Sequence, residues 1–388
     1  MIYLQELAFA CVITALAYYL ASTMAALWYV RPSKRKMPTL PKIAPRVAVL
    51  KPLHGLTYSL IENLVTYLEN SYPRAEYYFG VSGYDDRAAE VPVVLRTRYQ
   101  FSNITLVVGE EPGCANHKVG ALIRMADRAT KAEIFVLSDA DVSVSPEHLR
   151  RLVGELIADD RVGIVTCAYR ARPIGTFASR LEALFVNTDF LPQVLLSDAI
   201  EPLRHAFGAT IAIKRAALEA IGGFRAFKDV LADDYYIGYK AAKAGWRVKL
   251  SSSLVTVACE ERTFAEFWRH QLRWARTYRT ARPVSLATIV THGPFWALVA
   301  FFASIGTPLS TLALWSVFAV FAARITMSAV LLGRVAKLKD LTGDLALVPV
   351  RDLLSTAIWF ASLLSNKVVW AGRRFKIRRG GAMRELKA

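Results

Sequence analysis

Residues 134–141 read IFVLSDAD, a short apolar run that ends in two aspartates separated by one residue. A run of this length, rich in β-branched and aromatic residues, is typical of a buried strand. Four similar runs occupy residues 47–53, 77–81, 104–108 and 163–169. The segments between the first four runs are long enough for crossover helices, as at 58–69. This alternation predicts an α/β fold with a parallel, doubly wound sheet.

The two aspartates of this run, Asp139 and Asp141, directly follow a predicted strand. They are therefore expected at the carboxyl edge of the sheet, where α/β folds bind ligands. Hard carboxylate oxygens in this arrangement suit Mg²⁺ or Mn²⁺ bridging a diphosphate. The alternative interpretation is a solvated loop that leads into a helix after Ser145-Pro146-Glu147.

Two further acidic pairs follow other predicted elements. Asp85 and Asp86 come after the second strand, and a carboxylate there can bind a nucleobase or a ribose hydroxyl, although the composition is also that of a turn. Asp233 and Asp234 precede an amphipathic pattern over 235–243. They are either a helix N-cap or, for Asp234, a general base that accepts the proton of an attacking hydroxyl.

Aromatic and basic residues alternate over 263–276, a pattern that predicts an amphipathic helix in a membrane interface. Arg273 in this helix can pair with a phosphate, and Trp274 can pack beneath an acceptor. Interfacial anchoring alone is the other interpretation. Lys118 is a second candidate phosphate contact, with an ordinary helix-surface lysine as its alternative.

Both ends of the chain are apolar. Residues 7–30 carry no charge and end in Trp28 and Tyr29, followed by basic residues, which predicts an uncleaved membrane anchor with the rest of the chain on the cytoplasmic side. Residues 294–332 contain one charged residue, Arg324, and are long enough for two spans. A third stretch, 345–370, is interrupted by Arg351 and Asp352 and precedes a basic tail, so we expect it to be re-entrant or interfacial.

The expected organisation follows from these segments. We expect an anchor (1–30), a basic Pro-rich linker (31–46), a cytosolic catalytic domain (47–262), interfacial amphipathic helices (263–292), two transmembrane helices (293–333) and a re-entrant or interfacial segment with a basic tail (334–388). Beyond Arg31, the basic residues of the linker and the tail include Lys34, Arg35, Lys36 and Arg379.

Composition excludes several other classes of protein. There are 49 Lys and Arg against 32 Asp and Glu, a net charge of +17, which suits a chain lying on an anionic leaflet. No nucleic-acid motif accompanies this charge, so nucleic acid is not an expected partner. The four cysteines are widely separated and form no C-x-x-C pair, so neither a disulfide framework nor a zinc site is indicated. The glycines form neither a dinucleotide fingerprint nor a P-loop, so neither a dehydrogenase nor an NTPase is indicated.

Taken together, these motifs resemble the ceramide glucosyltransferases and their bacterial relatives among the inverting glycosyltransferases of the A-type, Rossmann-like fold. The resemblance covers most of the chain and rests on Lys51-Pro52-Leu53-His54-Gly55, Asn63-Leu64, Tyr72-Pro73, 81–86, Asn116-His117-Lys118, Asp139-Ala140-Asp141, Asp234-Tyr235, Gly245-Trp246-Arg247, Arg273-Trp274 and 370–381. The sequence departs from the family pattern at three places. His270 occupies the position of a family Gln or Arg, with Gln271 beside it, and Asp233 replaces a Glu. The eukaryotic ceramide enzymes lack the second aspartate, Asp141.

The resemblance implies a division of roles. Asp85 or Asp86 would lie at the nucleotide base, Asp139 and Asp141 at the diphosphate and metal, and Asp234 would be the catalytic base. Lys51, Lys118, Arg273 and Trp274 would contact the donor. Asp233, His270, Gln271 and again Trp274 would contact the acceptor.

The implied reaction is glucose transfer from UDP-glucose to a lipid hydroxyl such as that of ceramide, with Mg²⁺ or Mn²⁺, at a bacterial inner membrane. A hopanoid-associated group that transfers N-acetylglucosamine from UDP-GlcNAc has the same layout and is an alternative. A processive polysaccharide synthase is less favoured, because two spans after the catalytic region leave little material for a channel. A membrane protein that binds nucleotide sugar without catalysis is least favoured, because all the carboxylates are present.

Overall fold

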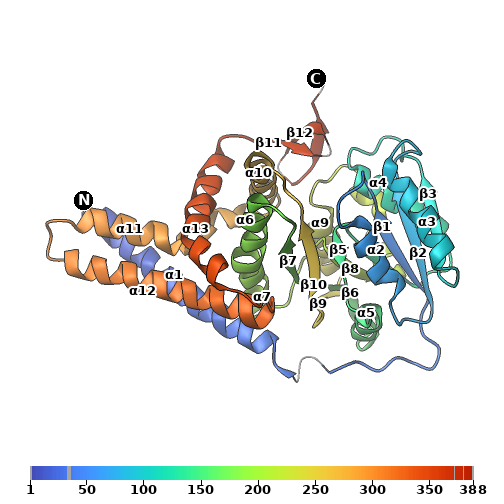
Figure 1. The fold of residues 1–388 in the computed structure, drawn as a ribbon, viewed down its shortest axis with the longest axis horizontal. Helices are drawn as coiled ribbons and strands as arrows, with labels where there is room; N and C mark the ends of the chain where they lie inside the picture. Colours follow the sequence, from blue (N-terminus) through green and yellow to red (C-terminus); the bar gives the residue numbers. More distant parts are fainter. Residues whose placement is uncertain (1, 33–35, 371, 379, 387–388) are drawn as a thin grey trace.

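The computed structural model describes residues 2–32, 36–370, 372–378 and 380–386 (Figure 1). Lys34, Arg35 and Arg379, three of the basic residues noted in the linker and the tail, lie outside the described residues. The described chain forms an α/β domain that adjoins a layer of long helices, with a small sheet near the C-terminus (Figure 1).

The central sheet has seven strands in the order β3-β2-β1-β4-β8-β6-β9. They are β1 (Val47–Pro52), β2 (Ala75–Val81), β3 (Asn103–Val108), β4 (Ile134–Ser138), β6 (Val162–Thr166), β8 (Thr210–Lys214) and β9 (Arg247–Leu250). Within the described residues, β8 alone runs antiparallel to its neighbours. Every residue of β4 and β6 is buried, as expected of strands covered on both faces. The predicted mainly parallel sheet is confirmed.

The helices of this domain flank the strands in chain order. They are α2 (Leu60–Leu68), α3 (Glu90–Arg98) after the short helix η2 (Arg87–Ala89), α4 (His117–Arg128), α5 (His148–Ile157), α8 (Arg215–Ala220), η4 (Phe224–Phe227) and α9 (Asp233–Lys243). Helix α4 packs on β1 and β2, and its apolar face supplies Val119, Leu122 and Ile123 to the core. The core thus forms between the sheet and the apolar stripes of these helices.

One strand predicted from the sequence was wrong in part. The run 163–169 divides into β6 in the central sheet and β7 (Tyr169–Pro173) in a second sheet of order β5-β10-β7. The chain changes sheets at Cys167 and Ala168, where the Cys167 N–H donates to Thr210 of β8 and Val255 donates to Ala168. The other strands of this sheet are β5 (Val142–Ser143) and β10 (Val255–Cys259). The second sheet lies directly after the Asp139–Asp141 turn.

A layer of helices follows on the side of the second sheet (Figure 1). It contains α6 (Phe177–Phe185), the π-helical turn η3 (Val186–Phe190), α7 (Leu191–Ile200) and α10 (Phe264–Ala281). Helix α10 begins with a capping box, in which Thr263 accepts a hydrogen bond from the Glu266 N–H and Glu266 accepts one from the Thr263 N–H. The amphipathic helix predicted from residue 263 is present and continues five residues beyond Arg276.

The outermost helices are apolar. They are α1 (Ile2–Tyr29), η5 (Pro283–Thr291), α11 (Gly293–Ser304), α12 (Ser310–Val330), the π-helical turn η6 (Leu331–Val335) and α13 (Thr342–Leu363). Helices α1, α11 and α12 lie side by side (Figure 1), and Gly293 allows α11 to approach α1 closely, since an added Cβ would lie 2.8 Å from Tyr19 Oη.

By length and composition, three segments of the described chain can cross a membrane: Ile2–Tyr29, Ser310–Val335 and Thr342–Leu363. The pair η5 and α11, bent by 57°, is a fourth candidate. Helix α11 alone has 12 residues, about 18 Å at about 1.5 Å per residue, so the first of the two predicted spans in 293–333 reaches the length of a hydrocarbon core only together with η5.

The C-terminal tail is folded rather than a simple basic extension. Strands β11 (Lys367–Trp370), β12 (Arg373–Ile377) and β13 (Met383–Glu385) form an antiparallel meander. It is joined to the catalytic domain by backbone hydrogen bonds from Leu231 to Gly381 and from Met383 to Asp229. The tail therefore abuts the segment that leads into α9.

Candidate active site

A cavity of 1240 Å³ begins at the carboxyl ends of the central strands and extends to the apolar helices. Its wall includes Asp139 and Asp141 at one end, Asp233 and Asp234 beside them, and residues of α1, η5, α12 and α13 at the other. A single continuous space thus contacts both the catalytic domain and the helices predicted to lie in the membrane.

Asp139 and Asp141 occupy the turn after β4, as predicted. The Asp139 carboxylate is 2.6 Å from Lys118 Nζ. One oxygen of Asp141, Oδ1, is buried and has no hydrogen-bond partner among the described residues. Burial and the negative charge of Asp139 together raise the pKa of Asp141 to about 7. The carboxylate pair therefore carries more negative charge than its surroundings balance.

Lys118 lies between the two acidic pairs, because α4 begins directly before it. Asn116 is the N-cap of α4 and donates to the Val230 carbonyl, which fixes the helix start against the segment before α9. Lys118 Nζ is 3.6 Å from Asp233 in addition to its contact with Asp139. Burial lowers the pKa of Lys118, but the carboxylates around it outweigh this effect and hold it above its ordinary value. Lys118 thus stays charged.

Lys51, a donor contact implied by the resemblance, is buried beside the Asp139–Asp141 turn. Its Nζ lies behind the Asp139–Asp141 turn and donates to the carbonyls of Asp139 and Val142, at 2.9 and 3.3 Å. The ammonium also lies 3.9 Å from the centre of the Tyr67 ring. Burial lowers the pKa of Lys51 to about 7. Its hydrogen bonds to these carbonyls stabilise the turn, and a direct contact between Lys51 and the donor stays a prediction.

Asp233 and Asp234 form the first turn of α9, whose N-cap is the apolar Ala232. The predicted capping role therefore falls to neither aspartate. Both aspartates line the cavity: Asp233 is buried and lies beside Lys118, and Asp234 faces Gly208, where an added Cβ would lie 3.0 Å from Asp234 Oδ2. Burial and the neighbouring Asp233 raise the pKa of Asp234 to about 6. This carboxylate is a stronger proton acceptor than an ordinary aspartate.

The pair after β2 divides into a structural and an exposed residue. Asp86 accepts hydrogen bonds from the Gly55 and Ala88 N–H groups, both at 2.9 Å, and caps η2. Its oxygens are therefore engaged in holding the loop, as the turn interpretation predicted. Asp85 is exposed at the same sheet edge. Between the two, Asp85 has the carboxylate that a nucleotide base could reach.

Helix α10 brings Arg273 and Trp274 to the cavity wall. The Trp274 ring packs edge-to-face with Phe185 and Phe190, with centroids 5.8 and 6.2 Å apart, and lies 5.2 Å from the His270 ring. Burial lowers the pKa of Arg273, although nearby carboxylates oppose the shift. Both residues thus line the cavity from the side of the helical layer, and their predicted contacts with phosphate and acceptor stay predictions.

Gln271 and His270 connect α10 to buried charge. Gln271 donates to Glu182 at 2.8 Å and accepts from Arg351 of α13 at 2.6 Å, and its side chain is buried. His270 Nδ1 lies 2.8 Å from Glu261 and 3.4 Å from Glu182. The two residues predicted to contact an acceptor are therefore held by partners that sequence reasoning had not identified.

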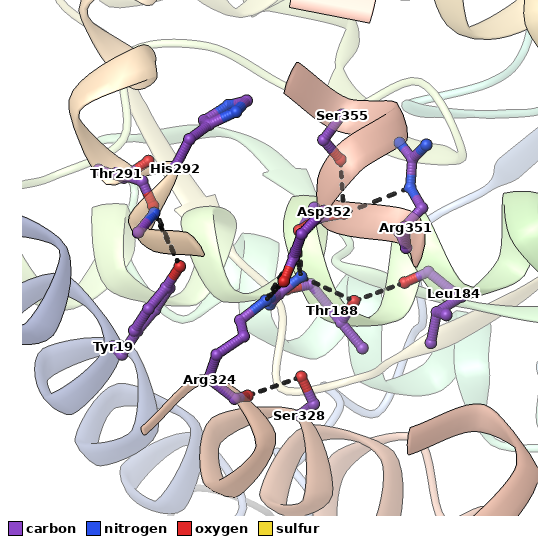
Figure 2. Close-up of polar contacts among 12 residues, drawn as sticks. Tyr19, Leu184, Thr188, Thr291, His292, Arg324, Ser328, Arg351, Asp352 and Ser355 are labelled. Carbon is purple, nitrogen blue, oxygen red and sulfur yellow. Dashed lines mark hydrogen bonds and ion pairs between the residues drawn. The ribbon is translucent and has the colours of Figure 1, made fainter. Parts of the chain in front are cut away.

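The membrane end of the cavity contains a second group of charges (Figure 2). Arg324 of α12 pairs with Asp352 of α13 at 2.8 Å and with Asp189 of η3 at 2.6 Å, and also donates to the Thr188 carbonyl. Arg351 lies 3.5 Å from Asp189. This pairing explains why an otherwise apolar stretch contains Arg324 and why Arg351 and Asp352 interrupt the next one.

Of the contacts that the sequence analysis did not predict, only the pairing of charged residues within apolar runs has a signal in the sequence. Charged residues in apolar runs usually pair with one another, so the sequence alone could have linked Arg324 to Asp352. Glu182, Asp189 and Glu261 lie in ordinary helical or loop contexts in the sequence, so nothing in their spacing marks them. Trp370 and Arg373 of the tail also line the cavity, a role that the sequence does not indicate.

The residues after β4 are suited to a divalent cation. The unpartnered buried oxygen of Asp141 and the adjacent Asp139 carboxylate are hard ligands at the edge of the cavity. The raised pKa of Asp141 has the same origin, because two carboxylates with incomplete compensation favour either a proton or a cation.

The sequence matches glycosyl transferase family 21 over residues 7–383. Two curated proteins of Caenorhabditis elegans are similar: ceramide glucosyltransferase 3, 22% identical over 232 residues (60% of this chain and 50% of that protein), and ceramide glucosyltransferase 1, 23% identical over 362 residues (90% and 74%). The alignment thus spans half the length of the first.

A solved structure with a similar fold is that of the mannosyltransferase PcManGT from Pyrobaculum calidifontis in complex with GDP-Man and Mn²⁺. It has a TM-score of 0.53 and 23% sequence identity, and covers 93% of this chain and 99% of that one. The predicted A-type fold is confirmed by this likeness.

Proposed function

Because the chain belongs to glycosyl transferase family 21 and is a glycosyltransferase, we propose that it moves a sugar from a nucleotide-sugar donor to a hydroxyl of a membrane lipid. The observation that carries this proposal is the continuous cavity, which joins the aspartates after β4 to the walls of α1, η5, α12 and α13. A lipid hydroxyl can reach the donor through this space while its chains remain among apolar helices.

The proposed donor is UDP-glucose and the proposed acceptor is ceramide, in line with the two similar ceramide glucosyltransferases. The cavity supports a lipid of this kind because its wall combines apolar residues of η5, such as Val284 and Leu286, and Pro294 of α11 with polar groups of α13.

In the proposed reaction, Asp234 accepts the proton of the acceptor hydroxyl. The hydroxyl oxygen then forms a bond to the anomeric carbon on the face opposite the nucleotide, the bond from that carbon to the diphosphate oxygen breaks, and the configuration inverts. A pKa of about 6 suits this role, since the carboxylate is ionised at neutral pH yet more basic than an ordinary aspartate.

Asp139 and Asp141 are the proposed metal ligands. A Mg²⁺ or Mn²⁺ ion held there would offset the charge that develops on the departing diphosphate. Among the chain's own residues, Arg273 and Lys118 supply positive charge at the same end of the cavity. Trp274 forms the wall between the proposed donor and acceptor sides. Asp85 is the proposed contact to the nucleotide base.

The C-terminal meander supports a proposed membrane topology. Its contacts with residues 229–231 put the tail on the same side as the catalytic domain. An even number of crossings must therefore separate α10 from β11. If α12 with η6 is one crossing and the bent pair η5–α11 is the other, α13 is the interfacial or re-entrant segment expected from the sequence. By the positive-inside rule the catalytic side is cytoplasmic, at the inner membrane in a bacterium.

The decisive experiment is reconstitution of the purified full chain in lipid nanodiscs with defined donor and acceptor pairs. We expect UDP-glucose and ceramide to yield a glucosylated lipid of β configuration, detected by mass spectrometry and glycosidase digestion. Parallel reactions contain UDP-GlcNAc with a hopanoid, or either donor without lipid. Product only with the hopanoid would replace the proposed acceptor, and a polymer formed without lipid would contradict lipid transfer altogether.

A further inference from the structure

A group of three potential metal ligands lies in the cavity wall apart from the Asp139–Asp141 turn. Glu182 belongs to α6, Glu261 to the loop between β10 and α10, and His270 to α10. One ligand atom from each residue lies within 4.8 Å of the others. Ligand atoms about 3 to 3.5 Å apart are expected around an ion with metal–ligand distances of about 2.0–2.2 Å, so small side-chain adjustments bring this group to that geometry.

The charges of this group are not balanced by hydrogen bonds. Glu182 is 1% exposed, and its Oε1 is buried without a hydrogen-bond partner among the described residues. The Oε2 atom of Glu261 is in the same condition. Both carboxylates face a single imidazole, His270, at 3.4 and 2.8 Å. The guanidinium groups of Arg273 and Arg351 attract Glu182 electrostatically, but Glu182 Oε1 and Glu261 Oε2 accept no hydrogen bond from a described residue, so a bound cation would give both oxygens the direct partner that they lack.

The surroundings hold these ligands in position from outside. Gln271 donates to the other oxygen of Glu182, and Arg351 in turn donates to Gln271. The backbone carbonyl of Glu261 accepts a hydrogen bond from Thr176, the N-cap of α6. Metal ligands are commonly oriented by such an outer set of hydrogen bonds. The arrangement therefore has features of a built site rather than of an accidental acidic cluster.

We propose that Glu182, Glu261 and His270 bind a first-row divalent transition-metal ion, distinct from the ion at Asp139 and Asp141. One imidazole nitrogen and two carboxylates form a ligand set that suits Zn²⁺ and its neighbours better than Mg²⁺. The ion links α6, the loop after β10 and α10. Because the His270 and Trp274 rings are 5.2 Å apart, the same ion fixes the face of α10 that meets the acceptor side.

The alternative is that a proton on His270 alone satisfies the carboxylates. In that case Nδ1 donates to Glu261 at 2.8 Å, and no ion is needed. The two interpretations differ in a measurable way, because metal binding requires a deprotonated imidazole nitrogen and a stoichiometric ion, whereas the protonated pair binds none.

The test is a metal titration of the full chain in detergent or nanodiscs, carrying Asp139→Asn and Asp141→Asn to remove the first site. We expect one Zn²⁺ per chain by elemental analysis after gel filtration, and a saturable calorimetric titration with Zn²⁺. Titration with Co²⁺ should produce visible absorption bands that Zn²⁺ abolishes. Neither readout requires sugar transfer, so the result is independent of the proposed reaction.

Variants assign the ion to this site. In the same background, His270→Gln and Glu182→Gln should each weaken Zn²⁺ binding at least ~10-fold, since loss of even an outer partner costs about that much. Glu62→Gln is the control, because Glu62 is an exposed carboxylate paired with Arg172 on the surface. His270 is partly exposed, so its variant is expected to fold even if Glu182→Gln does not. A folded parent that binds no Zn²⁺ or Co²⁺, or ion binding unchanged in His270→Gln, would overturn the proposal.

Discussion

Two groups of charged residues lie at opposite ends of one cavity, and their balance differs. At the sheet edge, four carboxylates, Asp139, Asp141, Asp233 and Asp234, face Lys118, Arg273 and the more deeply placed Lys51, whose pKa is lowered to about 7. At the membrane end, two arginines face two aspartates in direct ion pairs (Figure 2). The first group has a surplus of negative charge, and the second is neutral as a set.

This difference indicates what each group does. A balanced buried set has its partners already, so it stabilises the packing of α12, α13 and η3 against one another. An unbalanced set gains its partners only when a cation, a proton or a substrate arrives. Changes at the sheet edge should therefore alter chemistry with little loss of stability, and changes at the membrane end should do the reverse.

The largest expected effect is that of Asp234→Asn. Loss of the proposed base should reduce turnover about 10²–10⁴-fold, the range for a general base, while the dissociation constant of the donor changes little. Stopped-time assays of lipid product and calorimetric donor titration measure the two quantities. Asp229→Asn, in the segment before α9, is the control. Turnover within threefold of the unmodified enzyme would exclude Asp234 as the base.

Arg324→Met should have the largest effect on stability. It leaves Asp189 and Asp352 without their shared partner, a change that typically costs about 3–5 kcal/mol for a buried pair. Thermal unfolding in detergent, followed by fluorescence, measures the loss. Arg334→Met, at an exposed position on η6, is the matched control. Equal melting temperatures for the two variants would show that the membrane-end charges are not structural.

Asp141→Asn should weaken metal-dependent donor binding by about 10–100-fold, the scale on which changes around a metal site act. Donor affinity measured in the presence of a chelator should be the same for the variant and the unmodified chain. The variant should also unfold at a nearly unchanged temperature, because Asp141 Oδ1 has no hydrogen bond to lose. Chelator-resistant activity in the unmodified chain would contradict a metal at this turn.

The pH dependence of turnover tests the raised pKa of Asp234, which reflects the surplus of negative charge at the sheet edge. Because the pKa of Asp234 is raised to about 6, the base is ionised above that pH and becomes protonated below it. Turnover should therefore be constant near neutrality and fall about tenfold per pH unit below 6. Initial rates at saturating donor, measured from neutral pH to below pH 6, report this dependence. A rate that stays flat down to the ordinary aspartate range would mean that Asp234 is not buried in the working enzyme.

The smallest effect is expected from Ser355→Ala. Ser355 donates to Asp189 at 3.4 Å, a long and therefore weak hydrogen bond to a carboxylate whose charge is already paired. A loss of about 0.5–1.5 kcal/mol is typical of one such hydrogen bond. Thermal unfolding beside Arg324→Met measures it. A loss as large as that of Arg324→Met would show that hydroxyl contacts, rather than ion pairs, hold the membrane end together.

The sequence allowed the central sheet to be predicted because its strands are short, apolar and bounded. The run 134–138 coincides with β4, and β1 to β3 differ from their predicted ranges by one or two residues. It did not reveal that the run 163–169 divides between two sheets, because both halves are apolar and the division depends on hydrogen bonds to β8 and to Val255. The antiparallel direction of β8 has no local signature either.

The candidate site was predictable where its residues follow strands or form motifs. Asp139, Asp141, Asp234 and Arg273 are brought together as expected because strand ends and helix starts meet at one sheet edge. Glu182 and Glu261 were not predictable, since tertiary packing alone brings them to His270. Asp86 accepts backbone hydrogen bonds within its loop, as the turn interpretation predicted, and a contact of the Asp85–Asp86 pair with the nucleotide base stays a prediction.

The C-terminal meander has a consequence for biosynthesis. The ribosome synthesises helices α11 to α13 before β13, yet Asp229 and Leu231, just ahead of Asp234, are hydrogen-bonded to residues 383 and 381, respectively. Domains fold in order as they emerge. The segment before Asp234 therefore gains these backbone hydrogen bonds only after residues 381–383 have been synthesised, when the apolar helices already exist. A nascent chain cannot complete its catalytic segment ahead of its anchorage.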